Sequence, residues 1–252
     1  MLNHKDTIDP KLMAHDQAVR MMATWISAIA DQVKNPVAGI SAAATLIEKQ
    51  MASFRAAEAW DPSIVEEAVK LMIKRLSRFD NYLSELSGFT RDVNLDLKAW
   101  TLQGEWNTLE QAIVRRVPVD FRIIIDTQSQ LPIYADFERV TSILAALSIN
   151  SVEACGTAVQ PVIEISLSEF TDESCGQRGM ILRVEDNGPG FSDQALLEGL
   201  VPFFTTKDAG TGLGLAMVEK YVRAHGGWVK LNNKIIEGKA CGAVVELFFP
   251  AP

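Results

Sequence analysis

Apolar residues in the first third of the chain are spaced alternately by three and four positions. One such stripe runs from Met22 to Met51, and a second runs from Val65 to Leu86. Spacing of this kind is typical of amphipathic helices that meet along a coiled-coil-like seam. The pattern therefore predicts two long helices that present their apolar sides to a common partner surface.

A short polar segment separates the two stripes and predicts where the second helix begins. Asp61 can cap that helix, and Pro62 suits its first turn. We expect a polar lead-in over residues 1–13 and a helical hairpin over residues 14–91. One hairpin with such stripes buries little surface, so it is expected to form a homodimer whose core is a four-helix bundle.

The hydrophobic period changes after residue 91. Short β-like runs occur at residues 121–126, 162–170, 180–186 and 242–249, and helical stretches occur at residues 137–155 and 212–226. This alternation predicts a separate domain over residues 92–252, in which a layer of helices covers one face of a sheet. The expected fold class is therefore α+β, with a helical hairpin followed by an α/β sandwich.

Composition narrows the possible settings of this protein. The 252 residues carry a net charge of −8, which disfavours a nucleic-acid-binding surface. No apolar run approaches the ~20 residues that a membrane span requires. The three cysteines (Cys155, Cys175 and Cys241) are scattered and lack metal-binding spacing. These features predict a cytoplasmic protein with reduced thiols.

Two glycine-rich segments indicate a phosphate-binding site. EDNGPGF, residues 185–191, ends a predicted strand, and GTGLGL, residues 210–215, opens a predicted helix. Glycine lets a backbone approach a ligand closely, and the free N–H groups of a helix start favour phosphate. Either segment alone is compatible with an ordinary turn, but the two in this order, with PFFTTK at 202–207 between them, favour a nucleotide site.

These segments together resemble the ATP-binding domain shared by histidine kinases, gyrase-type topoisomerases, ninety-kilodalton heat-shock chaperones and mismatch-repair ATPases. DNGPG and GTGLGL resemble its two glycine boxes, and SILAALSINSVEAC, residues 142–155, resembles its asparagine box. PFFTTK resembles the phenylalanine box of histidine kinases. The resemblance implies ATP and Mg²⁺ as cofactors.

The resemblance also implies roles for single residues. Asp186 would accept a hydrogen bond from the adenine amino group, and Asn150 would bind Mg²⁺. Lys207 would lie near the triphosphate, in a lid between Phe191 and Gly210. The backbone positions implied are Gly188 and Gly190 in the adenine pocket, and Gly210, Gly212 and Gly214 around the phosphates.

One position departs from the pattern of that family. The residue one turn before the magnesium-binding asparagine is usually Asn or Glu, and here it is Ala146. The missing polar group affects the positioning of metal or water, and it leaves nucleotide binding possible.

The first predicted helix contains ADQVKNPVAGI, residues 30–40. Lys34, Asn35 and Pro36 match the phosphoacceptor motif of histidine kinases, and the following residues resemble the nitrogen-regulation subgroup. Pro36 removes one helical hydrogen bond and can bend the helix beside the motif.

The phosphoacceptor histidine of that motif is absent. Asp31 stands at its position, and Gln32 stands where the family has an acidic neighbour. Helical geometry turns Asp31 away from the seam, which is the orientation of an acceptor. A carboxylate would give a high-energy acyl phosphate, whereas imidazole offers a nucleophilic nitrogen near neutral pH.

Several functions fit these observations. The chain could be an ATP-binding histidine-kinase homologue that does not phosphorylate itself and controls a response regulator or a partner kinase. It could do so by docking, by heterodimerising, or by dephosphorylating a regulator with Asn35 orienting water. Alternatively it could phosphorylate a partner's histidine in trans, be phosphorylated on Asp31, or act as an ATP-gated scaffold. An ordinary kinase with an engineered substitution at position 31 would show the same sequence.

Overall fold

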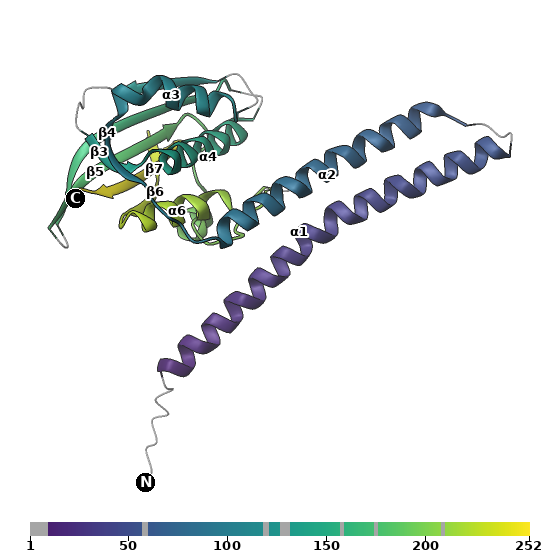
Figure 1. Cartoon of the computed structure of the whole chain (residues 1–252), viewed down its shortest axis with the longest axis horizontal. Helices are drawn as coiled ribbons and strands as arrows, with labels where there is room; N and C mark the ends of the chain where they lie inside the picture. Colours follow the sequence, from purple (N-terminus) through teal and green to yellow (C-terminus); the bar gives the residue numbers. More distant parts are fainter. Residues whose placement is uncertain are drawn as a thin grey trace, which may run out of the picture. The chain divides into compact units, whose positions relative to one another are not determined.

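The computed structural model describes residues 10–56, 60–117, 121–126, 132–156, 159–173, 176–207 and 210–252. The chain divides into two compact units, Met1–Gly88 and Phe89–Pro252 (Figure 1). Within the described residues, no helix combines the length and the apolar character needed to cross a bilayer.

The first unit is the predicted helical hairpin. Helix α1 spans Pro10–Arg55, and α2 spans Pro62–Thr90. The helix start expected at Asp61 is confirmed, because the Asp61 carboxylate accepts a hydrogen bond from the Ser63 backbone N–H at 2.9 Å. Pro36 lies inside α1, and the helix continues through it without interruption.

Much of the apolar surface of this hairpin remains exposed in the single chain. Only Ala43, Ala68 and Tyr82 are fully buried among its described side chains. The exposed large apolar side chains on its two helices are Val19, Met21, Met22, Ile26, Val37, Leu46, Met51, Phe54, Val69, Leu71, Ile73, Leu76 and Leu83. Exposed apolar surface on this scale is typical of a face that meets another protein.

The second unit is built on a five-stranded sheet with the strand order β2-β4-β5-β7-β6. The β2–β4 pair is parallel, and the other neighbours are antiparallel. The strands are β2 (Arg122–Asp126), β4 (Val162–Asp172), β5 (Gln177–Asp186), β6 (Trp228–Ile236) and β7 (Lys239–Pro250). A separate antiparallel pair joins β1 (Leu97–Thr101) to β3 (Pro132–Asp136).

Helices cover one face of this sheet (Figure 1). They are α3 (Leu102–Val114), α4 (Phe137–Cys155) and α6 (Gly214–Ala224), and a short helix α5 (Asp193–Glu198) follows β5. Along β4, Ile163, Ile165 and Leu167 are buried and belong to the core shared with the helices, while Glu164 and Ser168 are exposed. The predicted fold class, a helical hairpin followed by an α/β sandwich, is confirmed.

A hydrogen-bonded junction ties α4 and α6 to the small β1–β3 pair. The Asp136 carboxylate accepts hydrogen bonds from the backbone N–H groups of Arg139 and Asp96, at 3.0 and 2.9 Å. The Asp136 backbone N–H donates to Nε2 of His225 at 3.0 Å. Nδ1 of His225 lies 2.6 Å from the Tyr221 carbonyl and therefore carries the proton. The buried imidazole is thus held in one neutral tautomer.

We expect the stability of the second unit to fall in mild acid. Burial lowers the pKa of His225, against the opposing effects of the Tyr221 carbonyl and the Asp136 carboxylate. The unfolded chain therefore takes up a proton first, so stability is full above the unfolded pKa of ~6.5 and is lost as the pH drops below it. Hydrogen exchange of the α6 amides between pH 5 and 7 measures this loss.

The matched variant is His225→Gln, whose amide oxygen can accept from the Asp136 N–H but does not titrate. It should remove the pH dependence in that range. The lowered pKa of Asp136, where hydrogen bonds from Asp96 and Arg139 outweigh burial, acts only as the pH falls through ~3.8 and lies outside the range. An α6 stability equal at pH 5 and 7 in the wild type would contradict this assignment.

Candidate functional site

A buried carboxylate at the end of β5 organises the first half of the candidate site. Asp186 is 7% exposed and makes three hydrogen bonds. Its Oδ1 accepts from the backbone N–H groups of Gly188 and Ala243, both at 2.9 Å, and its Oδ2 accepts from the Ser151 hydroxyl at 2.8 Å. A carboxylate oxygen has two acceptor positions, so Oδ2 keeps one for a further donor. That capacity fits an adenine amino group.

The loop that follows Asp186 is fixed by two asparagine side chains. The Asn187 amide donates to the Gln160 carbonyl at 3.0 Å and accepts from the Val162 N–H at 2.8 Å. Asn233, on β6, binds both backbone groups of Phe191, at 2.6 and 2.8 Å. These bonds hold the glycine-rich loop to two different strands.

Glycine occupies two positions of this loop for different structural reasons. Gly190 has a φ of 81°, and a Cβ there would lie 2.7 Å from Oδ1 of Asn233. A Cβ on Gly188 would lie 3.1 Å from Oδ1 of Asp186 and 3.4 Å from Sγ of Cys155. Burial and the neighbouring Asp186 charge raise the pKa of the Cys155 thiol. Cys155 and Cys241 are free thiols, and Cys175 lies outside the described residues.

A second cluster forms at the neighbouring position of α4. Nζ of Lys207 lies 3.3 Å from Oδ1 of Asn150 and 2.5 Å from Oε2 of Glu153. Gly214, the first residue of α6, faces the same amide, because a Cβ there would meet the Asn150 side chain at 3.6 Å. Asn150, Lys207 and Gly214 thus converge from three separate segments of the chain, and their role at a triphosphate stays a prediction.

The other two glycines of the second box pack against the lid segment. Gly212 has a φ of 67°, and a Cβ there would lie 2.4 Å from the Phe203 carbonyl carbon. Its carbonyl accepts from the Phe203 N–H at 2.9 Å. A Cβ on Gly210 would lie 2.3 Å from Oγ1 of Thr205. Because Gly210 and Gly212 have no side chain, the turn before α6 can pack closely against Thr205 and Phe203. Of the three glycines in this box, only Gly214 faces Asn150.

The donors present fit a hard cation. Asn150 and Glu153 offer oxygen atoms, which Mg²⁺ prefers, and the Lys207 ammonium already bridges these two oxygens. No group of three or more His, Cys, Asp or Glu side chains able to hold a metal occurs among the described residues. A cation here would therefore need ligands from a nucleotide as well. Ala146 is partly buried against the core and offers no polar group.

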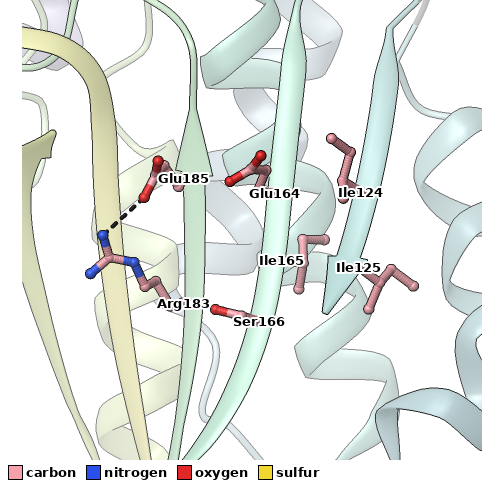
Figure 2. A pocket seen from close by; sticks show the side chains of 7 residues that line it. All are labelled: Ile124, Ile125, Glu164, Ile165, Ser166, Arg183 and Glu185. Atoms are coloured by element: carbon pink, nitrogen blue, oxygen red, sulfur yellow. Dashed lines mark hydrogen bonds and ion pairs between the residues drawn. The ribbon is translucent and has the colours of Figure 1, made fainter. Parts of the chain in front are cut away.

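A hollow of about 420 Å³ lies elsewhere, on the sheet face away from the helices. Figure 2 shows Glu164, Arg183 and Glu185 projecting from neighbouring strands, with helices behind the sheet. Arg183 pairs with Glu185 at 2.9 Å and with Glu246 at 3.0 Å, and Lys234 also contacts Glu185. Burial opposes ionisation of Glu185, but the hydrogen bonds from Lys234 and Arg183 lower its pKa overall. This network stabilises β5, the strand that ends in Asp186, from the sheet face away from the helices.

The remaining predicted site residues lie in the hairpin unit. Asp31 and Asn35 are both exposed on α1, one turn apart. Gln32, beside Asp31, is half-buried. The acceptor-equivalent position thus faces solvent in the single chain.

Sequence reasoning missed several residues of the candidate site. Ser151, Glu153, Asn187 and Asn233 all contact residues it had identified. Ser151 and Glu153 lie within the asparagine box, so their spacing from Asn150 was a usable signal. Asn233 lies 42 residues from its partner, and no local pattern marked it.

Comparison with known proteins covers both units. Residues 135–252 match the family described as histidine kinase-, DNA gyrase B- and HSP90-like ATPase. Sensor histidine kinase ZraS of Salmonella typhi is 29% identical over 98% of this chain and 49% of its own length. The sensory histidine kinase/phosphatase NtrB of Rhizobium meliloti is 27% identical over 91% of this chain and 59% of its own length. The chain spans about half the length of these curated relatives.

Solved structures show the same fold. The histidine kinase AdeS of Acinetobacter baumannii superposes with a TM-score of 0.50 at 20% identity, over 82% of this chain and 95% of its own. Full-length ShkA in complex with AMPPNP superposes with a TM-score of 0.53 at 20% identity, over 88% of this chain and 46% of its own. This chain is therefore similar to sensor histidine kinases over nearly its whole length, and residues 135–252 of its second unit match the ATPase family of histidine kinases, DNA gyrase B and HSP90.

Proposed function

We propose that this chain binds ATP with Mg²⁺ in its second unit and controls a response regulator or a partner kinase without phosphorylating its own α1. The observation that carries the proposal is the meeting of two clusters on α4. Ser151 anchors Asp186, and its neighbour Asn150 meets Lys207 and Gly214. The partner and its control by this chain belong to the proposal alone, because the curated relatives are about twice as long as this chain.

In this function the chain's own residues bind and orient the nucleotide. Oδ2 of Asp186 accepts from the adenine amino group, while Gly188 and Ala243 hold the carboxylate in place. The backbone N–H groups at the start of α6, where Gly214 lies beside Asn150, would bind the phosphates, and Asn150 would hold Mg²⁺. Bound Mg²⁺ neutralises charge on the triphosphate and thereby favours phosphoryl transfer.

The position of Asp31 separates nucleotide binding from self-phosphorylation. Its carboxylate is exposed on α1, where the related kinases carry their acceptor histidine by resemblance. The Asp31 carboxylate lacks the nucleophilic nitrogen of imidazole, and its phosphorylation would give a high-energy acyl phosphate. Asn35, one turn away and also exposed, is placed to orient water on a docked, phosphorylated regulator.

A second candidate is a kinase that acts in trans. It is favoured by the completeness of the α4 clusters, since Asn150, Lys207 and Asp186 all have ordered partners. Such a kinase would transfer the γ-phosphoryl group to a histidine of a partner bundle. Transfer of label from ATP to a partner, with none retained on this chain, would distinguish it from a regulator without transferase activity.

Nucleotide binding is the first outcome to test. A nonhydrolysable ATP analogue with Mg²⁺ should bind the full chain with a micromolar to submillimolar Kd in calorimetry. Asp186→Asn should weaken binding about tenfold or more, because it replaces an acceptor oxygen with a donor beside the adenine amino group. Glu169→Gln, which removes an exposed carboxylate on β4, is the matched control and should bind normally. Equal affinity in wild type and Asp186→Asn would refute the assigned site.

Phosphorylation of α1 provides a second test. The wild-type chain incubated with γ-labelled Mg-ATP should retain no label, and Asp31→His should gain acid-labile label because imidazole restores the nucleophile. Asp31→Asn removes the charge without adding a nucleophile and should stay unlabelled. Hydroxylamine-sensitive label on the wild type, absent from Asp31→Asn, would instead show that Asp31 is itself the acceptor.

Self-association of the hairpin is also part of the proposal. Apolar side chains such as Ile73 and Leu76 are more than half exposed in the single chain, so we expect light scattering to give the mass of two chains. Leu76→Asp should shift the mass toward one chain. Leu197→Asp is the matched control, since Leu197 is 86% exposed in the second unit and should leave the mass unchanged. A monomeric wild type would count against the bundle.

A further inference from the structure

The Lys207 ammonium bridges two oxygen donors that lie one turn apart on α4. It is 3.3 Å from Oδ1 of Asn150 and 2.5 Å from Oε2 of Glu153. Residues three apart on a helix present their side chains to the same side. A cationic group between an amide oxygen and a carboxylate oxygen marks a place where positive charge is stabilised.

Asn150 and Glu153 offer a cation oxygen ligands that the preceding turn of α4 does not offer. Ala146, one turn before Asn150, contributes no polar atom and packs against the core. Glu153, on the other side of Asn150, is 54% exposed at its side chain and keeps water access. Mg²⁺ retains several waters and binds through one or two protein oxygens together with phosphates. The geometry around Glu153 therefore suits a hydrated divalent cation.

We infer that Glu153 and Asn150 together hold the divalent cation of the bound nucleotide, and that Lys207 occupies their oxygens when nucleotide is absent. The inference rests on the proposed ATP binding and adds a second protein ligand, direct or through water. Ala146, one turn before Asn150, supplies no polar partner for the cation. Glu153, one turn after Asn150, supplies one instead.

Competition for these oxygens follows from simple electrostatics. The Lys207 ammonium and a divalent cation repel each other, so both cannot share Asn150 and Glu153 at close range. Loading the cation frees Lys207 from α4, and the triphosphate offers the ammonium new oxygen partners. The side chains of Lys207 and Glu153 are 38% and 54% exposed. Water therefore screens the ion pair, and replacing Lys207 by a cation costs little free energy.

The test measures metal binding directly by the electron paramagnetic resonance signal of Mn²⁺, which prefers the same oxygen ligands as Mg²⁺. Mn²⁺ is titrated into the full chain in the presence of a nonhydrolysable ATP analogue, with the protein in excess over the analogue and well above its Kd so that nearly all of the analogue is bound. Glu153→Gln should weaken Mn²⁺ binding about tenfold, because the amide lacks the carboxylate charge. Glu138→Gln, an exposed carboxylate in the first turn of α4, is the matched control and should not change it.

Lys207→Met distinguishes a metal ligand from a mere ion-pair partner. If Glu153 binds the cation, Lys207→Met keeps Mn²⁺ affinity at or above the wild-type value, and only Glu153→Gln lowers it. If Glu153 serves only to hold Lys207, both variants leave Mn²⁺ affinity equal to that of wild type, which overturns the inference while metal-free analogue binding still supports the proposed function. A wild type that binds no analogue at all would overturn the proposed function and this inference together.

Discussion

The candidate site of the second unit depends on the buried carboxylate of Asp186, which makes no ion pair with any described residue. A carboxylate withdrawn from water is costly unless hydrogen bonds replace its hydration. Asp186 meets that demand with three neutral donors, from Gly188, Ala243 and Ser151. These donors come from the loop after β5, from β7 and from α4, so the charge fixes three elements at once. Gly242 lets β7 approach the backbone of the same residue closely, because a Cβ there would lie 2.0 Å from the Asp186 carbonyl oxygen.

This anchoring also determines where the neighbouring side chain of α4 points. Ser151 and Asn150 are neighbours, and successive helical residues differ by about 100° around the axis. With Ser151 buried against Asp186, Asn150 must turn toward the lid segment and the start of α6. The adenine-recognition side and the cation side of the site are therefore set by one helix orientation. The contact between Lys207 and Asn150 depends on that orientation of α4.

The sequence predicted the parts of this arrangement that local chemistry encodes. The four strands and two helices that it identified in the second unit stand out by their apolar runs or helical period, and the glycine boxes combine a residue type with a fixed place at an element end. It missed α3 and β6, and also β1 and β3, which are five residues each and pair only with each other. It also missed Asn233, which lies at a register shift of β6 and acts on a segment 42 residues away. Such contacts depend on tertiary packing, which no periodic pattern records.

In the proposed function, nucleotide binding and phosphorylation of α1 are separate properties of the chain. The α1 helix passes through the motif intact, Asn35 and Pro36 are in place, and the Asp31 side chain is exposed. Repulsion between two unit negative charges about 4 Å apart in water is only about 1 kcal/mol, so electrostatics would not bar the approach of a phosphoryl group to Asp31. The proposal rests instead on the nucleophile, because Asp31 lacks the imidazole nitrogen that the resemblance implies for a phosphoacceptor. A nucleotide bound beside Asp186 and Asn150 would then act through a docked partner, whereas in the trans-kinase alternative the phosphoryl acceptor would be a histidine of that partner.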